Sequence, residues 1–168
     1  MKILLSCLYS FVATIGFCVI FNIRGKMVFF ASFGAALGWL AFELSAFFGT
    51  DLSQYFIATV VIALYAEIMA RLHKVPVTVY LIAALIPLVP GSGIYYTMEH
   101  FIDGNIDAFL STFVHTIAIA GCLAFGILLV SSLVRLTNRI KLDKNKRKVV
   151  GYSPTTFLKR RCEDDNTQ

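Results

Sequence analysis

Apolar residues in this chain gather in long unbroken runs rather than along one face of a helix or strand. Four runs of about 20 residues or more cover residues 3–23, 27–48, 52–70 and 108–134. A run of that length can cross a bilayer as a helix, so each of these four predicts a spanning helix. Only a few polar residues separate the first three runs, which predicts antiparallel neighbours.

A further apolar run, residues 75–89, is too short to cross a bilayer comfortably, and apolar residues resume only at 94–101. The segment between them, residues 87–93 (PLVPGSG), holds two prolines and two glycines. Proline removes a backbone donor and glycine frees φ, so a regular helix is not expected to pass through. We therefore predict an all-α integral membrane protein with five transmembrane helices, the fourth interrupted at a Pro/Gly break. The alternative has four spans, with the first two runs forming one bent unit.

Composition agrees with a membrane protein and excludes a soluble or disordered one. Apolar residues make up 58% of the 168 residues and charged residues only 15%, too few to cover the surface of a soluble domain. Residues 1–134 carry five basic and six acidic side chains, whereas the last 34 residues carry ten basic and four acidic ones. We predict a transmembrane domain over residues 1–135 and a basic, flexible cytoplasmic tail over 136–168. That tail suits anionic membrane lipid better than nucleic acid.

The basic side chains also predict an orientation. If the N-terminus lies outside, the inner segments hold 14 of the 15 Lys and Arg residues, which is the asymmetry expected of cytoplasmic loops. The predicted orientation is therefore N-terminus outside and C-terminus cytoplasmic, with an odd number of crossings. The first apolar run is too long for a signal peptide and lacks a small-residue cleavage site, so we expect it to be retained.

Three ionisable residues lie within the predicted spans: Glu43, Glu67 and His115. Placing such a group in hydrocarbon costs at least about 2.5 kcal/mol, so each is a candidate for function. At about 1.5 Å per residue, Glu43, His115 and the Pro/Gly break fall at similar depth. Broken backbone is tolerated at that depth only where protein or a water-filled cavity satisfies its polar groups. The sequence therefore predicts a polar pathway at this level of the membrane.

The candidate pathway residues come from the break and from the spans expected to flank it. They are Glu43, Pro87, Pro90, Gly91, Ser92, Gly93, Tyr95 and His115. If a second half-helix starts near Ser92, its free N–H groups would favour a carboxylate, and carbonyls ending the first half would favour an ammonium group or a cation. The alternative for the break is a packing kink. Tyr95 alternatively belongs to an interfacial aromatic belt, and His115 either passes a proton or is a structural histidine.

Two further patterns concern helix packing. Glu67 and Arg71 are four residues apart and predict an ion pair with a structural or gating role. Gly34 and Gly38 form a GxxxG pair, which permits close contact between helices.

The sequence favours no catalytic or metal-binding function. Ser92 and His115 are the residue types of a hydrolase dyad, but the serine lies in PGSG rather than GxSxG. No P-loop occurs, and the four cysteines have neither metal-ligand nor disulfide-framework spacing. We therefore expect no enzyme activity, no cofactor and no metal.

Three segments together resemble one family of membrane proteins. They are residues 66–76 (AEIMARLHKVP), residues 86–91 (IPLVPG) with Tyr95 close behind, and residues 34–39 (GAALGW). The pattern is similar to the small-subunit, YjjB-like half of the threonine/serine exporter family, and it covers most of residues 20–135. The basic tail has no counterpart in it.

The resemblance implies a subunit of a two-component secondary exporter in the bacterial plasma membrane. It implies export of small amino acids (threonine and serine) or small carboxylates at the expense of the proton gradient, with a larger YjjP-like subunit as partner in a homo- or hetero-oligomer. The alternatives are a structural or assembly subunit that transports nothing, and a passive channel.

Overall fold

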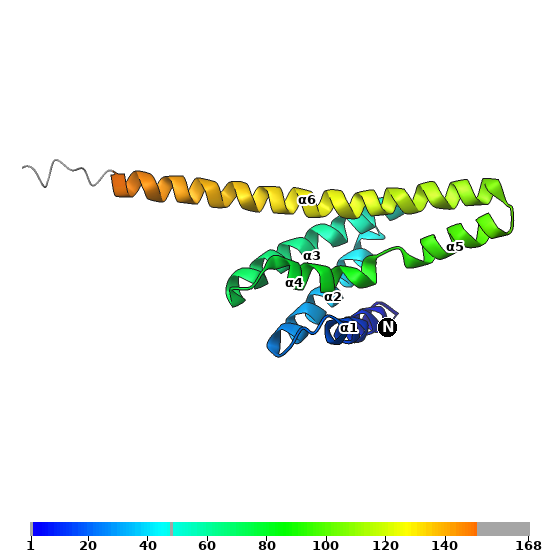
Figure 1. Ribbon diagram of the computed structural model, residues 1–168, viewed down its shortest axis with the longest axis horizontal. Helices are drawn as coiled ribbons and strands as arrows, with labels where there is room; N and C mark the ends of the chain where they lie inside the picture. The colour runs from blue at the N-terminus through cyan, green and yellow to red at the C-terminus, as the bar shows by residue number, and fades with distance from the viewer. Residues whose placement is uncertain (1, 48, 151–168) are drawn as a thin grey trace, which may run out of the picture. The chain divides into compact units, whose positions relative to one another are not determined.

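The computed structural model describes residues 2–47 and 49–150, and the side chains of residues 3–47 and 49–140. Within these residues the chain is helical, and no strand occurs (Figure 1). The elements are α1 (Lys2–Ile20), α2 (Lys26–Ser45), α3 (Asp51–His73), α4 (Val77–Leu85), the 3-10 helix η1 (Ile86–Leu88), α5 (Gly91–Ile102) and α6 (Ile106–Val150). The all-α prediction is confirmed.

The helices agree with a multi-pass membrane protein. α1, α2, α3 and α6 are each long and apolar enough to cross a bilayer. A bend of 49° separates α4 and η1 from α5. If this bent pair is one span, it is the fifth candidate span. The four-span alternative treated the first two apolar runs as one bent unit, but α1 and α2 are separate helices. Whether the chain has four or five candidate spans depends instead on the bend at the Pro/Gly break. Gly25, with φ +72°, caps the start of α2 after the turn.

Small side chains allow α1, α3 and α4 to pack closely against α2. Two apolar clusters form the interior. One consists of Ala35, Ala58, Ile62, Ala84, Leu88, Ile119 and Leu123, and the other of Cys18, Ala31, Ala66, Ala70, Tyr80 and Ala83. Large apolar side chains instead lie exposed on the outer faces, as expected where a bilayer replaces water.

The GxxxG pair on α2 marks its closest approach to α3. A Cβ added at Gly34 would lie 2.7 Å from the ring of Tyr65, and one added at Gly38 would collide with the end of the Ile62 side chain. The Tyr65 ring has little freedom to move, because its hydroxyl donates to the Phe30 carbonyl at 2.9 Å. The predicted close helix contact is therefore present, and it joins α2 to α3.

α6 continues beyond the predicted end of the transmembrane domain. The chain divides into two compact units at Ser131/Ser132, near the predicted boundary at 135, but the helix itself continues to Val150. Residues 132–150 contain neither proline nor glycine, so no helix-breaking residue ends α6 before Gly151. Residues 136–150 of the predicted tail are thus helical, and residues 151–168 lie outside the described residues. The flexibility and the cytoplasmic location of the tail stay predictions.

Replacing Gly34 by alanine tests the α2–α3 contact. Gly34→Ala should destabilise the fold by about 1–3 kcal/mol, because the new methyl group must displace a hydrogen-bonded ring. Gly16→Ala on α1 is the matched control, since no atom lies within 4 Å of its added Cβ. We expect a lower thermal unfolding midpoint in detergent for Gly34→Ala and an unchanged or higher one for Gly16→Ala. Equal midpoints for the two variants would contradict this packing.

Candidate functional site

A cavity of about 340 Å³ opens beside the Pro/Gly break. Three elements line it: Ser6, Tyr9, Ser10 and Ala13 of α1, Trp39 of α2 and Pro87 of η1. This volume lies at the lower end of the range for small-molecule sites and equals that of about ten water molecules. Side chains therefore do not fill the space on this side of the break.

The break follows from the backbone chemistry of its two prolines. Pro87 lies within η1, where α4 tightens and ends, and Val89 is extended. Gly91 N–H donates to the Val89 carbonyl at 2.7 Å, and α5 begins at Gly91, directly after the buried Pro90. The predicted restart of the helix near Ser92 is therefore confirmed.

The α1 wall of the cavity is held to α2 through hydroxyl groups. Ser10 Oγ donates to the Ala35 carbonyl of α2 at 3.3 Å, and Thr14 Oγ1 donates to the Ser10 carbonyl at 2.8 Å. Trp39 Nε1 is buried and makes no hydrogen bond within the described residues. Buried donors are normally paired, and an unpaired one costs about 1–3 kcal/mol, so this indole N–H is a candidate donor to a bound molecule.

Glu43 lies one helical turn beyond Trp39 on α2 and is half-buried. Glu43 does not line the cavity, but it lies four residues after the cavity-lining Trp39, on the same face of α2. Of the predicted pathway residues, Pro87 lines the cavity.

His115 lies elsewhere. It is exposed on α6, as is Ser111 one turn earlier, and within the described residues no hydrogen bond or ion pair joins His115 to Glu43. Ser92 and Tyr95 are exposed on α5, and the Tyr95 ring contacts that of Tyr96 with centroids 5.5 Å apart. Equal depth along two helices does not fix the rotation of either one, so a shared depth does not by itself bring Glu43 and His115 together.

The two glycines of the break differ in role, and neither uses a positive φ. Gly91 has open space where a Cβ would be, whereas a Cβ at Gly93 would lie 2.5 Å from Thr116 Oγ1 of α6. We predicted that these glycines release φ, and the structure instead uses Gly93 to let α5 approach α6. Thr97 Oγ1 donates to the Gly93 carbonyl at 2.6 Å, and Thr116 Oγ1 donates to the Thr112 carbonyl at 2.7 Å, which satisfies the hydroxyls near this contact.

Glu67 and Arg71 do pair on α3. Arg71 Nε lies 3.8 Å from Glu67 Oε2, with the glutamate side chain 16% exposed and the arginine side chain 48% exposed. A half-exposed pair at this spacing adds little to stability. Neither residue lines the cavity beside the break.

The described residues contain no group of three or more His, Cys, Asp or Glu side chains placed to hold a metal ion. Cys7, Cys18 and Cys122 are free thiols. The fourth cysteine, Cys162, lies outside the described residues.

Our sequence interpretation missed the contribution of α1. Ser6, Ser10 and Thr14 recur every four residues and so form one polar stripe on an otherwise apolar helix. Ser6 and Ser10 line the cavity, and Thr14 Oγ1 donates to the Ser10 carbonyl. This four-residue spacing could have predicted which face of α1 contacts the rest of the protein.

Comparison with known proteins identifies the family. The family described as "Threonine/Serine exporter, ThrE" matches residues 6–133. The chain belongs to the ThrE family. A curated protein of Haemophilus influenzae (strain ATCC 51907 / DSM 11121 / KW20 / Rd), described as uncharacterized, is 27% identical over 138 residues, which cover 77% of this chain and 46% of that protein. The chain thus spans about half the length of this relative. No solved structure matches the chain.

Membership of the ThrE family makes the chain a multi-pass membrane protein of the threonine/serine exporter type. The match begins at Ser6 on the cavity wall and ends at Leu133, just before the basic residues of α6 begin at Arg135. It therefore includes every residue that lines the cavity beside the break.

The two glycines of the break provide a matched pair of variants. Gly93→Ala should lower the thermal unfolding midpoint, at a cost of about 1–3 kcal/mol, because its methyl group meets Thr116 Oγ1. Gly91→Ala should leave the midpoint unchanged. The double variant Gly93→Ala/Thr116→Ala should recover most of the loss, which a double-mutant cycle measures. An equal loss for Gly91→Ala and Gly93→Ala would show that the α5–α6 contact is not what requires glycine.

Proposed function

We propose that this chain is the small, YjjB-like subunit of a two-component secondary exporter for threonine and serine or small carboxylates. The observation that carries the proposal is the 340 Å³ cavity beside the Pro/Gly break, because open space next to broken backbone is how secondary transporters build substrate sites. We place the chain in a bacterial plasma membrane with its N-terminus outside and its C-terminus in the cytoplasm, in accord with the distribution of Lys and Arg.

The polar groups around the cavity suit a small hydroxy amino acid. Ser6 and Ser10 bring hydroxyl groups to the cavity wall, and Trp39 brings an indole N–H. Because the Ser10 hydroxyl donates to the Ala35 carbonyl, its oxygen can accept from a substrate hydroxyl or ammonium group, whereas Trp39 Nε1 can donate to a substrate hydroxyl or carboxylate. Glu43 supplies a carboxylate for the ammonium group of the substrate or for a proton. The N-terminal turn of α5 adds backbone N–H groups that favour a carboxylate.

Two observations support a second, larger membrane subunit. This chain spans 46% of the length of its Haemophilus relative, which leaves room there for another segment of similar size. His115 lies nine residues into α6, about 13 Å along the helix, with its side chain exposed. Exposing this polar ring to lipid would be unfavourable, and a neighbouring polypeptide on this face removes that cost. In line with the family resemblance, we propose a YjjP-like protein as this neighbour.

Coupling to the proton gradient is assigned to Glu43. A half-buried carboxylate one helical turn from the cavity-lining Trp39 can take up and release a proton as the cavity opens to either side of the membrane. Glu67 and Arg71, paired on α3, are the candidates for a gating contact that breaks during this change. No catalytic step is assigned to the chain.

Efflux from whole cells tests the proposal. Cells loaded with labelled threonine, serine or succinate should release at least one of them faster when this chain and a YjjP-like partner are both present than with either alone. Collapsing the proton gradient with an uncoupler should slow that release. Release insensitive to the uncoupler indicates a passive channel, and absence of partner-dependent release of all three solutes contradicts the proposal.

Replacing Glu43 separates a transporting subunit from a structural one. Glu43→Gln should lower partner-dependent efflux at least about tenfold, which corresponds to about 1.4 kcal/mol in the barrier, while the two subunits still copurify. Glu99→Gln, at an exposed position on α5, is the matched control and should leave efflux unchanged. Loss of copurification, or unchanged efflux in Glu43→Gln, would favour the structural alternative.

A further inference from the structure

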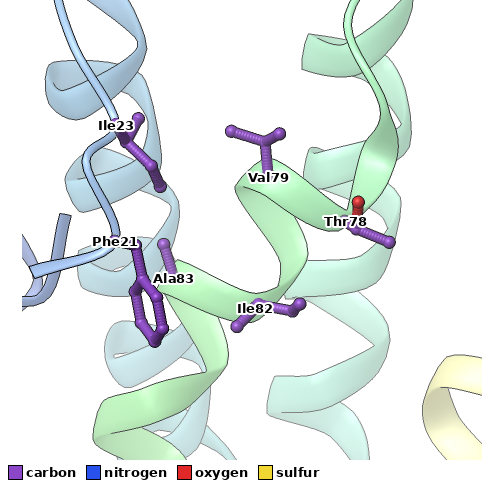
Figure 2. Close-up of a pocket in the computed structure, with 6 residues that line it drawn as sticks. All are labelled: Phe21, Ile23, Thr78, Val79, Ile82 and Ala83. Carbon is purple, nitrogen blue, oxygen red and sulfur yellow. The ribbon is translucent and has the colours of Figure 1, made fainter.

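A second hollow, a groove of about 230 Å³, lies between the α1–α2 turn and α4. Its lining residues are Phe21, Ile23, Thr78, Val79, Ile82 and Ala83 (Figure 2). Figure 2 shows the Phe21 ring beside Ala83, with Ile82 on the same turn of α4 and Thr78 about one turn earlier, near the start of the helix. Thr78 carries the only polar side chain of the six. The groove is therefore apolar with a single hydroxyl group near the start of α4.

The position of the groove corresponds to the boundary between lipid headgroups and acyl chains. Phe21 and Ile23 belong to the turn that follows α1, and Thr78 is the second residue of α4. Ala83 comes six residues after the start of α4 at Val77, about 9 Å along the helix. The groove thus extends from the ends of the helices into the part of the hydrocarbon layer that adjoins the headgroups.

Basic side chains surround this end of the bundle. Ile23 and Val75 pack against the same apolar cluster, so the α1–α2 and α3–α4 turns meet there. Arg24 follows Ile23 in the chain, and Lys74 precedes Val75. Lys26 begins α2, and all three basic residues are exposed. Each of the three cations therefore lies within four residues, along the chain, of a residue that lines the groove.

Nearby acidic groups do not neutralise these cations. Within the described residues, the acidic side chain next to these turns is Glu67, and it pairs with Arg71. Arg24 Nε donates to Asn22 Oδ1 at 2.9 Å, which leaves the other guanidinium N–H groups to bind an anion. The rim of the groove is therefore positively charged.

We propose that this groove binds an anionic phospholipid. The phosphate lies among Arg24, Lys26 and Lys74, the Thr78 hydroxyl bonds to an ester or glycerol oxygen, and one acyl chain lies along α4. Charge complementarity selects an anion, and the apolar lining selects one that carries a hydrocarbon chain. A helix about 10 Å across would fill several times 230 Å³ over two turns, so the groove suits a single flexible chain better than a partner helix.

Lipid binding to the purified full-length chain tests the charged rim. Native mass spectrometry should show phosphatidylglycerol retained at concentrations about tenfold lower than phosphatidylcholine with the same acyl chains. Arg24→Gln/Lys74→Gln should reduce that preference, even though the basic residues after Val134 remain. Arg135→Gln/Arg139→Gln, which removes two exposed arginines of α6, is the control and should preserve it. If the first pair does not fold, Lys26→Gln/Lys74→Gln tests the same rim.

A second pair of variants tests the groove itself. Ile82→Trp, at a side chain 52% exposed, should fill the groove and lower retention of phosphatidylglycerol, whereas Ile68→Trp, at a side chain 55% exposed on α3, should not. Inorganic phosphate should not displace the lipid. Equal retention of both lipids, displacement by phosphate, loss of preference in the α6 control, or full binding by a folded Ile82→Trp would each overturn the proposal. None of these outcomes depends on whether the chain transports a solute.

Discussion

The structure depends on one constraint, which is that backbone N–H and C=O groups cannot be left unsatisfied in hydrocarbon. Pro87 and Pro90 interrupt the helix between α4 and α5, so the groups freed there need protein or water beside them. α1 and α2 supply this surrounding on one side of the break, where the 340 Å³ cavity lies. A break of this kind on a lipid-facing surface would be costly, and this cost explains why polar residues of α1 lie next to it.

Close helix packing is what keeps the cavity walls in place. Gly34 and Gly38 allow α2 to lie against α3, and Gly93 allows α5 to lie against Thr116 of α6. The same close packing excludes bulky side chains from the interior, so the large apolar residues are left for the lipid-facing surface. Ser10 then joins α1 to α2 through the Ala35 carbonyl, beside the indole of Trp39. The hydrogen bond from Ser10 to Ala35 thus belongs both to the packing of α1 against α2 and to the wall of the cavity.

The sequence predicts the helices well because hydropathy and proline act locally. Run length locates the four long helices, and Pro87 and Pro90 locate the break, including the start of α5. Rotation about a helix axis is a tertiary property, so the sequence could place Glu43 and His115 at one depth but not turn them toward each other. It also missed Ser6 and Ser10, since hydroxyl groups are common in membrane helices. Gly93 was assigned to backbone freedom, whereas its neighbour Thr116 lies 23 residues away in the chain and is invisible to local pattern.

Thiol accessibility in the membrane tests most directly whether the break opens into a wet cavity. In a chain with its native cysteines replaced, Ala13→Cys lies on the cavity wall and Val12→Cys, one residue away, lies at an exposed position on the same helix that does not line the cavity. A charged, membrane-impermeant thiol reagent should modify the cysteine at position 13 and leave that at position 12 unreacted, and threonine should slow the reaction at position 13. Absence of reaction at both positions would mean that the cavity is dry, which contradicts the account.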